Sequence, residues 1–328
     1  MLKVGVIGVG YLGRHHARIY AQMPGVTLVG VSDLHAERGQ AIAAEYGTKF
    51  FADYREMLGQ VEAVSLAVPT IDHCEIGCEL LRQGIAVLVE KPIARTLAEA
   101  DQMIQLAEKH NVCLQVGHLE RFNPAIVAVR PLVKEPRFFE THRLSLFSPR
   151  SLDIDVVMDL MIHDLDIIAS LVKSPIVNIH AVGVAVITPK FDIANARIEF
   201  ASGCIANITA SRISTEKVRK LRLFQPHDYI SIDYITQQAG FWSLRKPLNL
   251  PSGITDPAAL LASGIGIEAR QLDIKADEPL RAELAAFVQA VTTSEPPPVS
   301  GAEGRHALAL ALQVSDKIAE HARKVGLE

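Results

Sequence analysis

The chain has 328 residues, of which 49% are apolar and 21% are charged, as in an ordinary globular protein. Its net charge of −4 excludes the basic field by which proteins bind nucleic acid or anionic membranes. No run approaches the roughly 20 apolar residues of a membrane-spanning helix. The length indicates two domains or one large one. The sequence shows no signal-peptide pattern and no cysteine spacing typical of zinc sites or disulfide frameworks, so we expect a cytoplasmic protein without a metal site.

A glycine-rich turn follows the first expected strand, Leu2 to Ile7, and leads into a helical run over residues 14–23. A second expected strand, residues 26–33, ends on an aspartate about 20 residues after the last glycine, where dinucleotide-binding proteins place a ribose-binding acid. The glycines permit a tight turn, close approach of the backbone to a pyrophosphate and close helix packing, and the helix N-terminus favours phosphate. The pattern predicts cofactor binding by Gly8, Gly10, Tyr11, Leu12, Gly13 and Asp33.

Asp33 also indicates which nicotinamide cofactor is bound. Its carboxylate would accept hydrogen bonds from both ribose hydroxyls of NAD and repel the 2′-phosphate of NADP. Arg38 lies five residues further on, either countering that repulsion or lying as a solvated helix residue. We expect NAD, with NADP the less favoured alternative.

Strands and helices continue to alternate up to about residue 117. Expected strands at residues 63–69, 86–90 and 112–117 enclose expected helices at 72–83 and 96–109, which predicts a parallel, doubly wound sheet and an NAD-binding domain over residues 1–120. Ligands of such sheets bind beyond the carboxyl ends of the strands. That rule adds to the cofactor-site candidates Pro69, Thr70, His73, Glu90, Lys91 and His118. For His73 the alternative is a first-turn helix residue exposed to water.

Residues 155–172 read as a helix that is apolar nearly all round. At 100° per residue, a polar stripe falls within about 80° of the wheel and consists of Asp155, Asp159, His163, Asp166 and Ser170. Burying carboxylates costs free energy unless they are paired. Two interpretations are open. Either the stripe faces a cavity where Asp159 and His163 act on a ligand, or it is a solvated edge whose histidine is held by the neighbouring acids.

The pattern changes after Pro131, and residues 121–328 are expected to form a substrate-binding and oligomerisation domain. β-branched and aromatic residues predict strands at 137–147, 176–187, 194–201, 204–213 and 220–234. Ser202-Gly203 predicts an antiparallel hairpin. Residues 236–274 are expected to be irregular, followed by helices at 280–293 and 302–324. A sheet with helices on one face leaves the other face able to pair in a dimer.

Several basic residues are candidates for binding a substrate that carries a diphosphate, because arginine forks match phosphate oxygens. Arg150 and Arg212 lie at expected strand ends or just before the helix of residues 155–172. The basic cluster of residues 217–222 binds phosphate in the same way or is a solvated strand and turn. Arg121 and Asn123 follow the last strand of the first domain, where they meet the sugar or brace the junction between the domains.

The N-terminal GxGxxG turn, Glu90-Lys91-Pro92 and the Asp159-x-x-x-His163 pair together resemble the Gfo/Idh/MocA oxidoreductase family. The resemblance implies an α/β fold, with an N-terminal Rossmann domain and a C-terminal α/β domain whose large, open sheet is mostly antiparallel. It also implies a sugar or polyol substrate, NAD(P) as cofactor, and homodimers or homotetramers formed through the sheet. Lys91, Asp159 and His163 match the catalytic lysine, aspartate and histidine of the family. Met161 departs from the glycine that the family often has, which bears on substrate fit more than on chemistry.

A narrower resemblance, to bacterial UDP-N-acetylglucosamine 3-dehydrogenases, is carried by residues 117–125, 156–167 and 206–224. It implies oxidation of the sugar C3 hydroxyl ahead of an aminotransferase, on the way to a modified lipid A. His163 would take the hydroxyl proton, Asp159 would orient or polarise it, and Lys91 would hold the substrate oxygens. The alternatives are a dehydrogenase for another nucleotide sugar or a free polyol such as an inositol, and a regulator that binds NAD without reaction.

Overall fold

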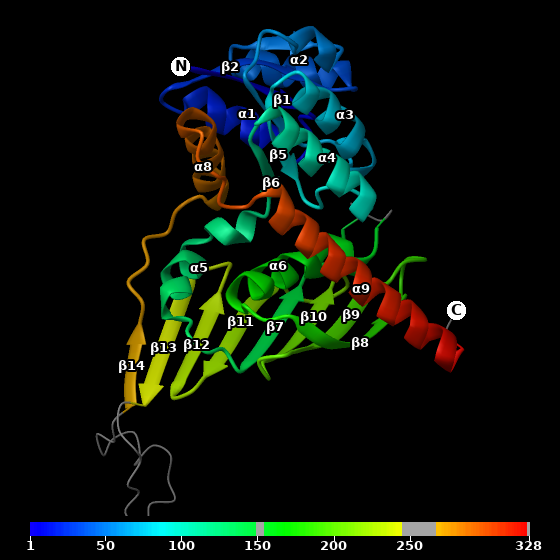
Figure 1. Cartoon of the computed structure of the whole chain (residues 1–328), viewed down its shortest axis with the longest axis vertical. Coiled ribbons are helices and arrows are strands. Elements are labelled where there is room, and N and C mark those ends of the chain that lie inside the picture. Colours follow the sequence, from blue (N-terminus) through cyan, green and yellow to red (C-terminus); the bar gives the residue numbers. More distant parts are fainter. Residues whose placement is uncertain (149–153, 245–266, 327–328) are drawn as a thin grey trace, which may run out of the picture. The chain divides into compact units, whose positions relative to one another are not determined.

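The computed structural model describes residues 1–148, 154–244 and 267–326. The chain divides into two compact units (Figure 1). The first comprises residues 1–122 and 277–310, and the second comprises residues 123–276 and 311–328. The sequence-based division into 1–120 and 121–328 assigned residues 277–310 to the second domain. They pack in the first unit because Leu280, Leu284 and Phe287 belong to the hydrophobic core of that unit.

The first unit contains a six-stranded parallel sheet in the order β3-β2-β1-β4-β5-β6. The strand order reverses between β1 and β4, which is the switch point where doubly wound sheets bind ligands. The predicted parallel, doubly wound sheet is confirmed. Its strands are β1 (Leu2–Ile7), β2 (Val26–Ser32), β3 (Lys49–Phe51), β4 (Ala63–Leu66), β5 (Ala86–Glu90) and β6 (Leu114–Gly117).

Helices pack against this sheet, and their apolar faces complete its core. The sequence reasoning missed α2 and β3, because α2 buries only Gly39 and Ala43 and therefore shows little apolar periodicity. The helices of the first unit are α1 (Gly13–Gln22), α2 (Ala36–Glu45), η1 (Tyr54–Met57), α3 (Thr70–Arg82), α4 (Leu97–His110), η2 (Leu119–Phe122), α8 (Pro279–Thr293) and the first part of α9 (Gly301–Val325).

The second unit contains an eight-stranded sheet in the order β14-β13-β12-β11-β7-β10-β9-β8. Neighbouring strands are antiparallel except β7 and β10, which are parallel. The mostly antiparallel sheet implied by the resemblance is confirmed. The strands are β7 (Phe138–Leu144), β8 (Ile176–Val184), β9 (Ile193–Phe200), β10 (Ile205–Ser211), β11 (Val218–Gln225), β12 (Asp228–Asp233), β13 (Gln238–Leu244) and β14 (Ile267–Gln271).

The hairpins of this sheet partly correct the sequence-based strands. The Ser202-Gly203 hairpin is confirmed, with Gly203 at φ +80° between the paired strands β9 and β10. The single strand expected over residues 220–234 is wrong, because Pro226 and His227 (φ +67°) make a turn that separates β11 from β12. The expectation of irregular chain over 236–274 is wrong at both ends, which form β13 and β14, and residues 245–266 lie outside the described residues.

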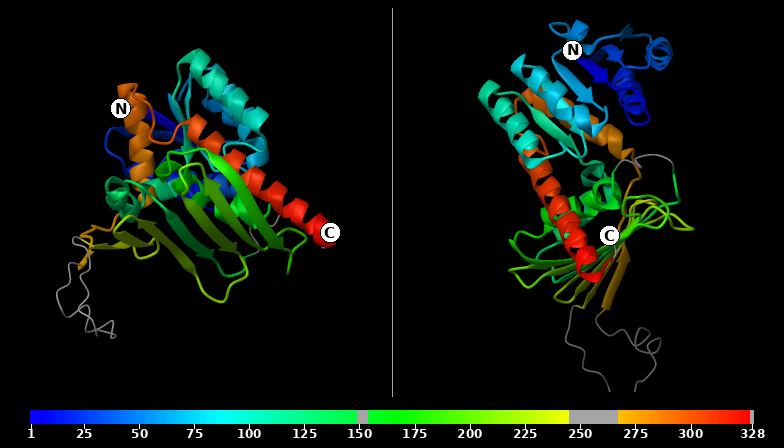
Figure 2. Two further views of the ribbon diagram at one scale, coloured as in Figure 1. Left: turned by 60° about the horizontal axis from the view of Figure 1, so that its bottom comes forward. Right: turned by 90° about the vertical axis from the view of Figure 1, so that its right-hand side faces the viewer.

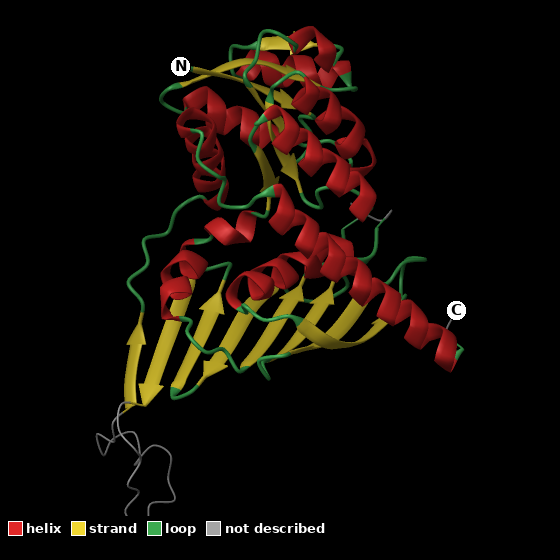
Figure 3. Ribbon diagram, viewed as in Figure 1, coloured by secondary structure: helices red, strands yellow, loops and turns green. Residues whose placement is uncertain are grey.

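Helices of the second unit cover one face of its sheet (Figure 3). Among the described residues the opposite face of the strands carries no helix, as Figure 2 shows. A row of stacked aromatic side chains crosses this open face on β7, β11, β12 and β13, with neighbouring ring centroids 5.8, 4.8 and 4.9 Å apart; it consists of Phe138, Phe224, Tyr229 and Trp242. The helices are α5 (Pro124–Val129), η3 (Arg130–Leu132), η4 (Val157–Met161), α6 (Ile162–Leu171) and the last part of α9.

Two further findings concern what the described residues do not contain. None of the described helices combines the length and the apolar character needed to cross a membrane. The same residues hold no group of three or more His, Cys, Asp or Glu side chains suited to a metal ion.

Candidate active site

The glycine turn connects β1 to α1 at the carboxyl end of β1, as predicted. Gly8 adopts φ +82°, and a Cβ atom there would lie 2.6 Å from the carbonyl oxygen of Ala67. A Cβ atom on Gly13 would overlap with the carbonyl oxygen of Gly8, whereas one on Gly10 would meet no atom within 4 Å. The fold itself therefore requires Gly8 and Gly13. Gly10 leaves open space above the turn, and Tyr11 and Leu12 are exposed beside it.

Replacing Gly10 by alanine is expected to weaken NAD binding roughly tenfold or more without lowering the melting temperature of the cofactor-free protein. The added methyl group contacts nothing in the fold, but it fills the space through which the backbone approaches the pyrophosphate. Calorimetric titration with NAD and thermal unfolding measure the two effects. Gly13→Ala is the contrasting variant and should lower the melting temperature. An unchanged NAD affinity in Gly10→Ala would contradict this role.

Asp33 follows β2, and its buried carboxylate faces the glycine turn. Its Oδ2 accepts a hydrogen bond from the Val9 amide at 2.9 Å, and its Oδ1 accepts one from the His35 amide at 2.8 Å. Arg38 donates to both oxygens, at 3.0 and 2.6 Å. Burial alone would raise the pKa of Asp33, but these donors together hold it below its usual value. Arg38, for which two roles were open, therefore pairs with an ionised Asp33.

At equal concentrations, NAD is expected to raise the melting temperature of the protein more than NADP does. The ionised Asp33 favours the ribose hydroxyls of NAD and repels the 2′-phosphate, and a ligand bound only by the folded state stabilises it. In Asp33→Ser this difference should shrink or reverse, because Arg38 loses its carboxylate partner and can bind phosphate. A wild-type protein stabilised more by NADP would show that the cofactor preference is wrong.

Glu90 is the last residue of β5, Lys91 and Pro92 follow it, and Lys91 is half-buried. The Glu90 carboxylate is buried and lies 3.1 Å from Nε2 of His16 on α1. Burial acts to raise the pKa of Glu90, but the His16 hydrogen bond and charge hold it below the usual value. His73 is buried rather than exposed, with its ring nitrogens 2.9 Å from the Pro92 carbonyl oxygen and 3.0 Å from that of Val68. Pro69 and Thr70 begin α3, which follows the carboxyl end of the neighbouring strand β4.

A second carboxyl group, Glu283 of α8, is fully buried in the first unit. Neither of its oxygens has a hydrogen-bond partner among the described residues. Burial and the negative charge of Glu90 raise the pKa of Glu283 well above its usual value. The backbone carbonyl of Glu283 accepts a hydrogen bond from the Gln115 side chain of β6 at 3.2 Å. Burial and the nearby charge therefore favour the protonated form of Glu283 in the folded protein.

Glu283→Gln is expected to stabilise the protein at neutral pH and to leave its stability nearly unchanged near pH 4. Below a pH of about 4.5, glutamate is protonated in both the folded and the unfolded chain. Above it, the unfolded chain releases the proton and the folded chain keeps it, so the free energy of unfolding falls by about 1.4 kcal/mol per pH unit up to the raised pKa. Glutamine has no proton to release. Denaturant unfolding from pH 4 to 8 measures this difference, with exposed Glu75→Gln as control. A gain independent of pH would contradict it.

Three further candidates, His118, Arg121 and Asn123, lie after β6. His118 is buried directly after the strand. Arg121 is buried in η2 and pairs with Glu303 of α9 at 3.1 Å. Asn123 caps α5 by accepting a hydrogen bond from the Ala125 amide at 3.1 Å, and its Nδ2 donates to the Tyr234 carbonyl at 3.1 Å. For Arg121 and Asn123 each of these contacts lies within a single unit, and a role toward the sugar or the domain junction stays a prediction.

The helix expected over residues 155–172 begins with a π-helical segment, η4, and continues as α6. A single wheel at 100° per residue therefore does not describe the whole stripe; π segments of this kind are frequent at functional sites. Asp159 on η4 and His163 on α6 are both half-exposed. Asp155 instead accepts hydrogen bonds from the Val157 and Met158 amides, both at 2.9 Å. Ser170 bonds back to the Ile167 carbonyl.

Asp164 lies on α6 opposite the predicted polar stripe, and it has a buried ion-pair partner that the sequence did not reveal. Arg143 of β7 donates from Nε and Nη2 to the two oxygens of Asp164, at 2.7 and 3.1 Å. The Arg143 guanidinium also lies 5.3 Å from the ring centroid of Tyr234. The ion pair fixes the far side of α6 to the sheet and explains how a buried carboxylate is tolerated there.

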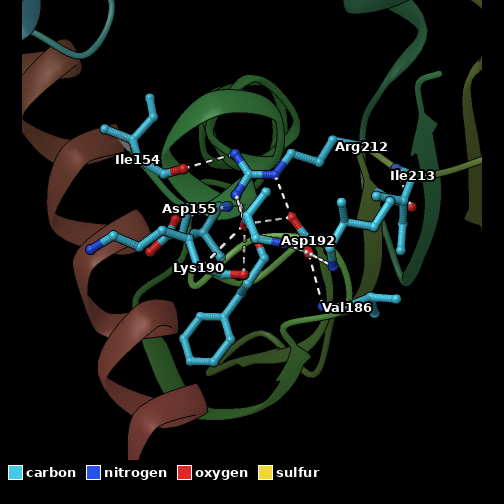
Figure 4. A network of polar contacts seen from close by, with 12 residues as sticks. Ile154, Asp155, Val186, Lys190, Asp192, Arg212 and Ile213 are labelled. Carbon is cyan, nitrogen blue, oxygen red and sulfur yellow. Dashed lines mark hydrogen bonds and ion pairs between the residues drawn. The ribbon is translucent and has the colours of Figure 1, made fainter. Parts of the chain in front are cut away.

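Arg212 follows β10 and lies in a buried polar network, shown in Figure 4. It pairs with Asp192 at 2.9 Å and donates to the Ile154 carbonyl at 2.8 Å. Its expected contact with a diphosphate would have to compete with these partners. Arg150, the other arginine expected to bind diphosphate, lies outside the described residues.

Sequence reasoning missed His16, Glu283, Arg143 and Asp192. One feature of the sequence could have identified His16. It lies on the apolar, buried face of α1, together with Ala17 and Ile19. A charged or polar residue on an otherwise buried face indicates a partner elsewhere in the fold. The partner itself is 74 residues away in the chain, and nothing in the local sequence identifies it.

The doubly wound sheet, the glycine turn and Asp33 define a dinucleotide-binding oxidoreductase. Comparison with known families agrees: residues 2–118 match the oxidoreductase family with an NAD-binding Rossmann fold, and residues 136–225 match the Gfo/Idh/MocA C-terminal domain. The chain belongs to the Gfo/Idh/MocA oxidoreductase family. Its cofactor is NAD, which suits the open space at Gly10 and the ionised Asp33.

Relatives of the chain include enzymes that act on sugars and polyols. It is 38% identical over 315 residues to the UDP-N-acetylglucosamine 3-dehydrogenase of Acidithiobacillus ferrooxidans, covering 95% of this chain and 96% of the relative. A solved structure of that enzyme superposes with a TM-score of 0.88 at 37% identity, covering 97% of both chains. The myo-inositol 2-dehydrogenase of Thermotoga maritima is 25% identical over 351 residues, covering 100% of this chain and 99% of the relative.

Proposed function

We propose that the chain oxidises the C3 hydroxyl of UDP-N-acetylglucosamine with NAD. The observation that carries the proposal is the 38% identity, over nearly the full length of both chains, to an enzyme that bears this activity in its name. The solved structure of that enzyme shares the fold throughout. A modified lipid A precursor as the eventual product remains part of the proposal.

We propose Lys91, Asp159 and His163 as the catalytic residues. When bound, NAD supplies the acceptor for the hydride that leaves the sugar carbon. His163 takes the hydroxyl proton as general base, a role that imidazole side chains often play. Asp159 orients or polarises it, and the Lys91 ammonium holds the substrate oxygens. Support comes from the partial exposure of all three side chains, whereas Glu90, Asp164 and Arg212 are buried in ion pairs.

The test is NADH formation, followed by absorbance, from a panel of UDP-sugars and inositols. The proposal expects UDP-N-acetylglucosamine to give the highest kcat/KM. Preference for a free inositol would replace the substrate with a polyol, a candidate favoured by the full-length similarity to myo-inositol 2-dehydrogenase. NAD binding without NADH from any compound would favour a regulator instead.

We propose that two copies pair through the open face of the eight-stranded sheet. The stacked row of Phe138, Phe224, Tyr229 and Trp242 lies on that face, and Phe224 and Trp242 are 38% and 36% exposed. Partly exposed aromatic rows are enriched in protein interfaces. Light scattering should give twice or four times the 35.7 kDa chain mass; a monomer at micromolar concentration would overturn this pairing.

A further inference from the structure

The guanidinium of Arg212 is held on several sides by partners within the second unit (Figure 4). Its Nε donates to Oδ1 of Asp192 at 2.9 Å, and its Nη1 donates to the carbonyl oxygen of Ile154 at 2.8 Å. Its Nη2 donates to Oγ1 of Thr188 at 3.1 Å and to the carbonyl oxygen of Phe191 at 3.4 Å. The side chain is almost completely buried. A buried group with this set of partners is poorly placed to receive a hydrated diphosphate.

Asp192, the partner of Arg212, is fully buried just before β9. Its Oδ2 accepts hydrogen bonds from the amides of Val186, Ile187 and Thr188 at 2.8, 2.7 and 2.9 Å, and its Oδ1 accepts one from the Thr188 hydroxyl at 2.8 Å. Burial acts to raise its pKa, but these donors hold it well below the usual range. The Asp192 carboxylate is therefore ionised. Its hydrogen bonds hold both the hairpin after β8 and the Arg212 side chain in place.

The network reaches the residues that precede η4. Arg212 holds the carbonyl of Ile154, and the Val156 amide donates to the Phe191 carbonyl at 3.0 Å. Between them, Asp155 caps the first turn and accepts a hydrogen bond from the Ser315 hydroxyl of α9 at 3.2 Å. Residues 154–156 are therefore held from several sides directly before the segment that carries Asp159 and leads to His163.

We propose that Arg212 and Asp192 are positioning residues that set where η4 begins and so place Asp159 and His163 for proton transfer. This rests on the proposed function and replaces the expected contact between Arg212 and a diphosphate. In this proposal the two residues act without contact to the substrate or the cofactor. They act through the backbone at Ile154 and Val156, and small displacements of catalytic groups are costly, since about 1 Å can reduce rate on the order of 100-fold.

The kinetic test compares Arg212→Met and Asp192→Asn with a matched control. The control is Arg137→Met, which removes an exposed arginine–carboxylate pair of the same unit (Arg137 to Glu135, 3.5 Å). The proposal expects kcat to fall roughly 100-fold in both variants, KM for UDP-N-acetylglucosamine to change less than about threefold, and the double variant to be no slower than either single variant. A large rise in KM in Arg212→Met alone would restore the diphosphate role and overturn the proposal.

Hydrogen exchange tests the same idea without substrate. Peptides covering residues 154–163 should exchange faster in Arg212→Met and Asp192→Asn than in Arg137→Met or the wild type. If Arg212→Met does not fold, Arg212→Lys keeps a cation there and serves in its place. Unchanged exchange over this segment overturns the positioning role, whatever the activity. Absence of NADH formation by the wild type overturns only the proposed function, and the exchange result still decides the positioning role.

Discussion

The His163→Ala variant is expected to lose about two orders of magnitude or more in kcat while its affinity for NAD stays unchanged. Alanine removes the group that takes the hydroxyl proton and leaves no base in its place. NAD binding should survive, because the glycine turn and Asp33 belong to the first unit and His163 belongs to the second. His163 is half-exposed on α6, so its loss should lower the melting temperature by little.

The measurement is steady-state NADH formation over a range of pH, together with calorimetric titration of NAD. His180→Ala is a matched control, because His180 is an exposed histidine on β8 of the same unit. We expect wild-type kcat in His180→Ala and a low kcat at every pH in His163→Ala. Near wild-type turnover in this variant would show that another group acts as the base.

Replacing Lys91 by methionine is expected to have the second large effect on activity. Methionine keeps the apolar length of the side chain and removes only the ammonium, so the fold around β5 should persist. Lys91 is half-buried directly after Glu90. We expect kcat/KM to fall about 100-fold or more, because an ammonium that contacts a developing charge acts most strongly in the transition state.

Kinetics and thermal unfolding of Lys91→Met decide this point together. Lys109→Met removes an exposed lysine at the end of α4 and serves as the control. A rise in KM with unchanged kcat would mean that Lys91 only binds the substrate. A lower melting temperature that accounts for the lost activity would mean that Lys91 supports the fold instead.

The parts of the fold that the sequence predicted correctly depend on local rules. Gly8 and Gly13 are required by a turn whose carbonyl oxygens leave no room for a Cβ atom. A six-residue sequence motif is enough to predict this requirement. The alternation of strands and helices likewise predicts a parallel sheet, because parallel neighbours need a crossover connection. Such features need no knowledge of distant residues.

The features that sequence reasoning missed depend on partners far apart in the chain. The apolar face of α8 shows that the helix is buried, but not that it completes the core of the first unit more than 150 residues after that unit's last strand. As an arginine near a strand end, Arg212 was predicted to bind phosphate. It is instead buried in an ion pair with Asp192, which lies just before β9. The π-helical segment at residues 157–161 was also missed, because the helical wheel assumes 100° per residue.

The most direct measurement of the central claim uses UDP-N-acetylglucosamine that carries deuterium at C3. The wild-type protein and NAD should yield reduced cofactor that is heavier by the mass of one deuterium, and His163→Ala should yield it at least about 100-fold more slowly. Reduced cofactor without the deuterium would mean that a different carbon is oxidised. No reduced cofactor at all from this substrate would contradict the account.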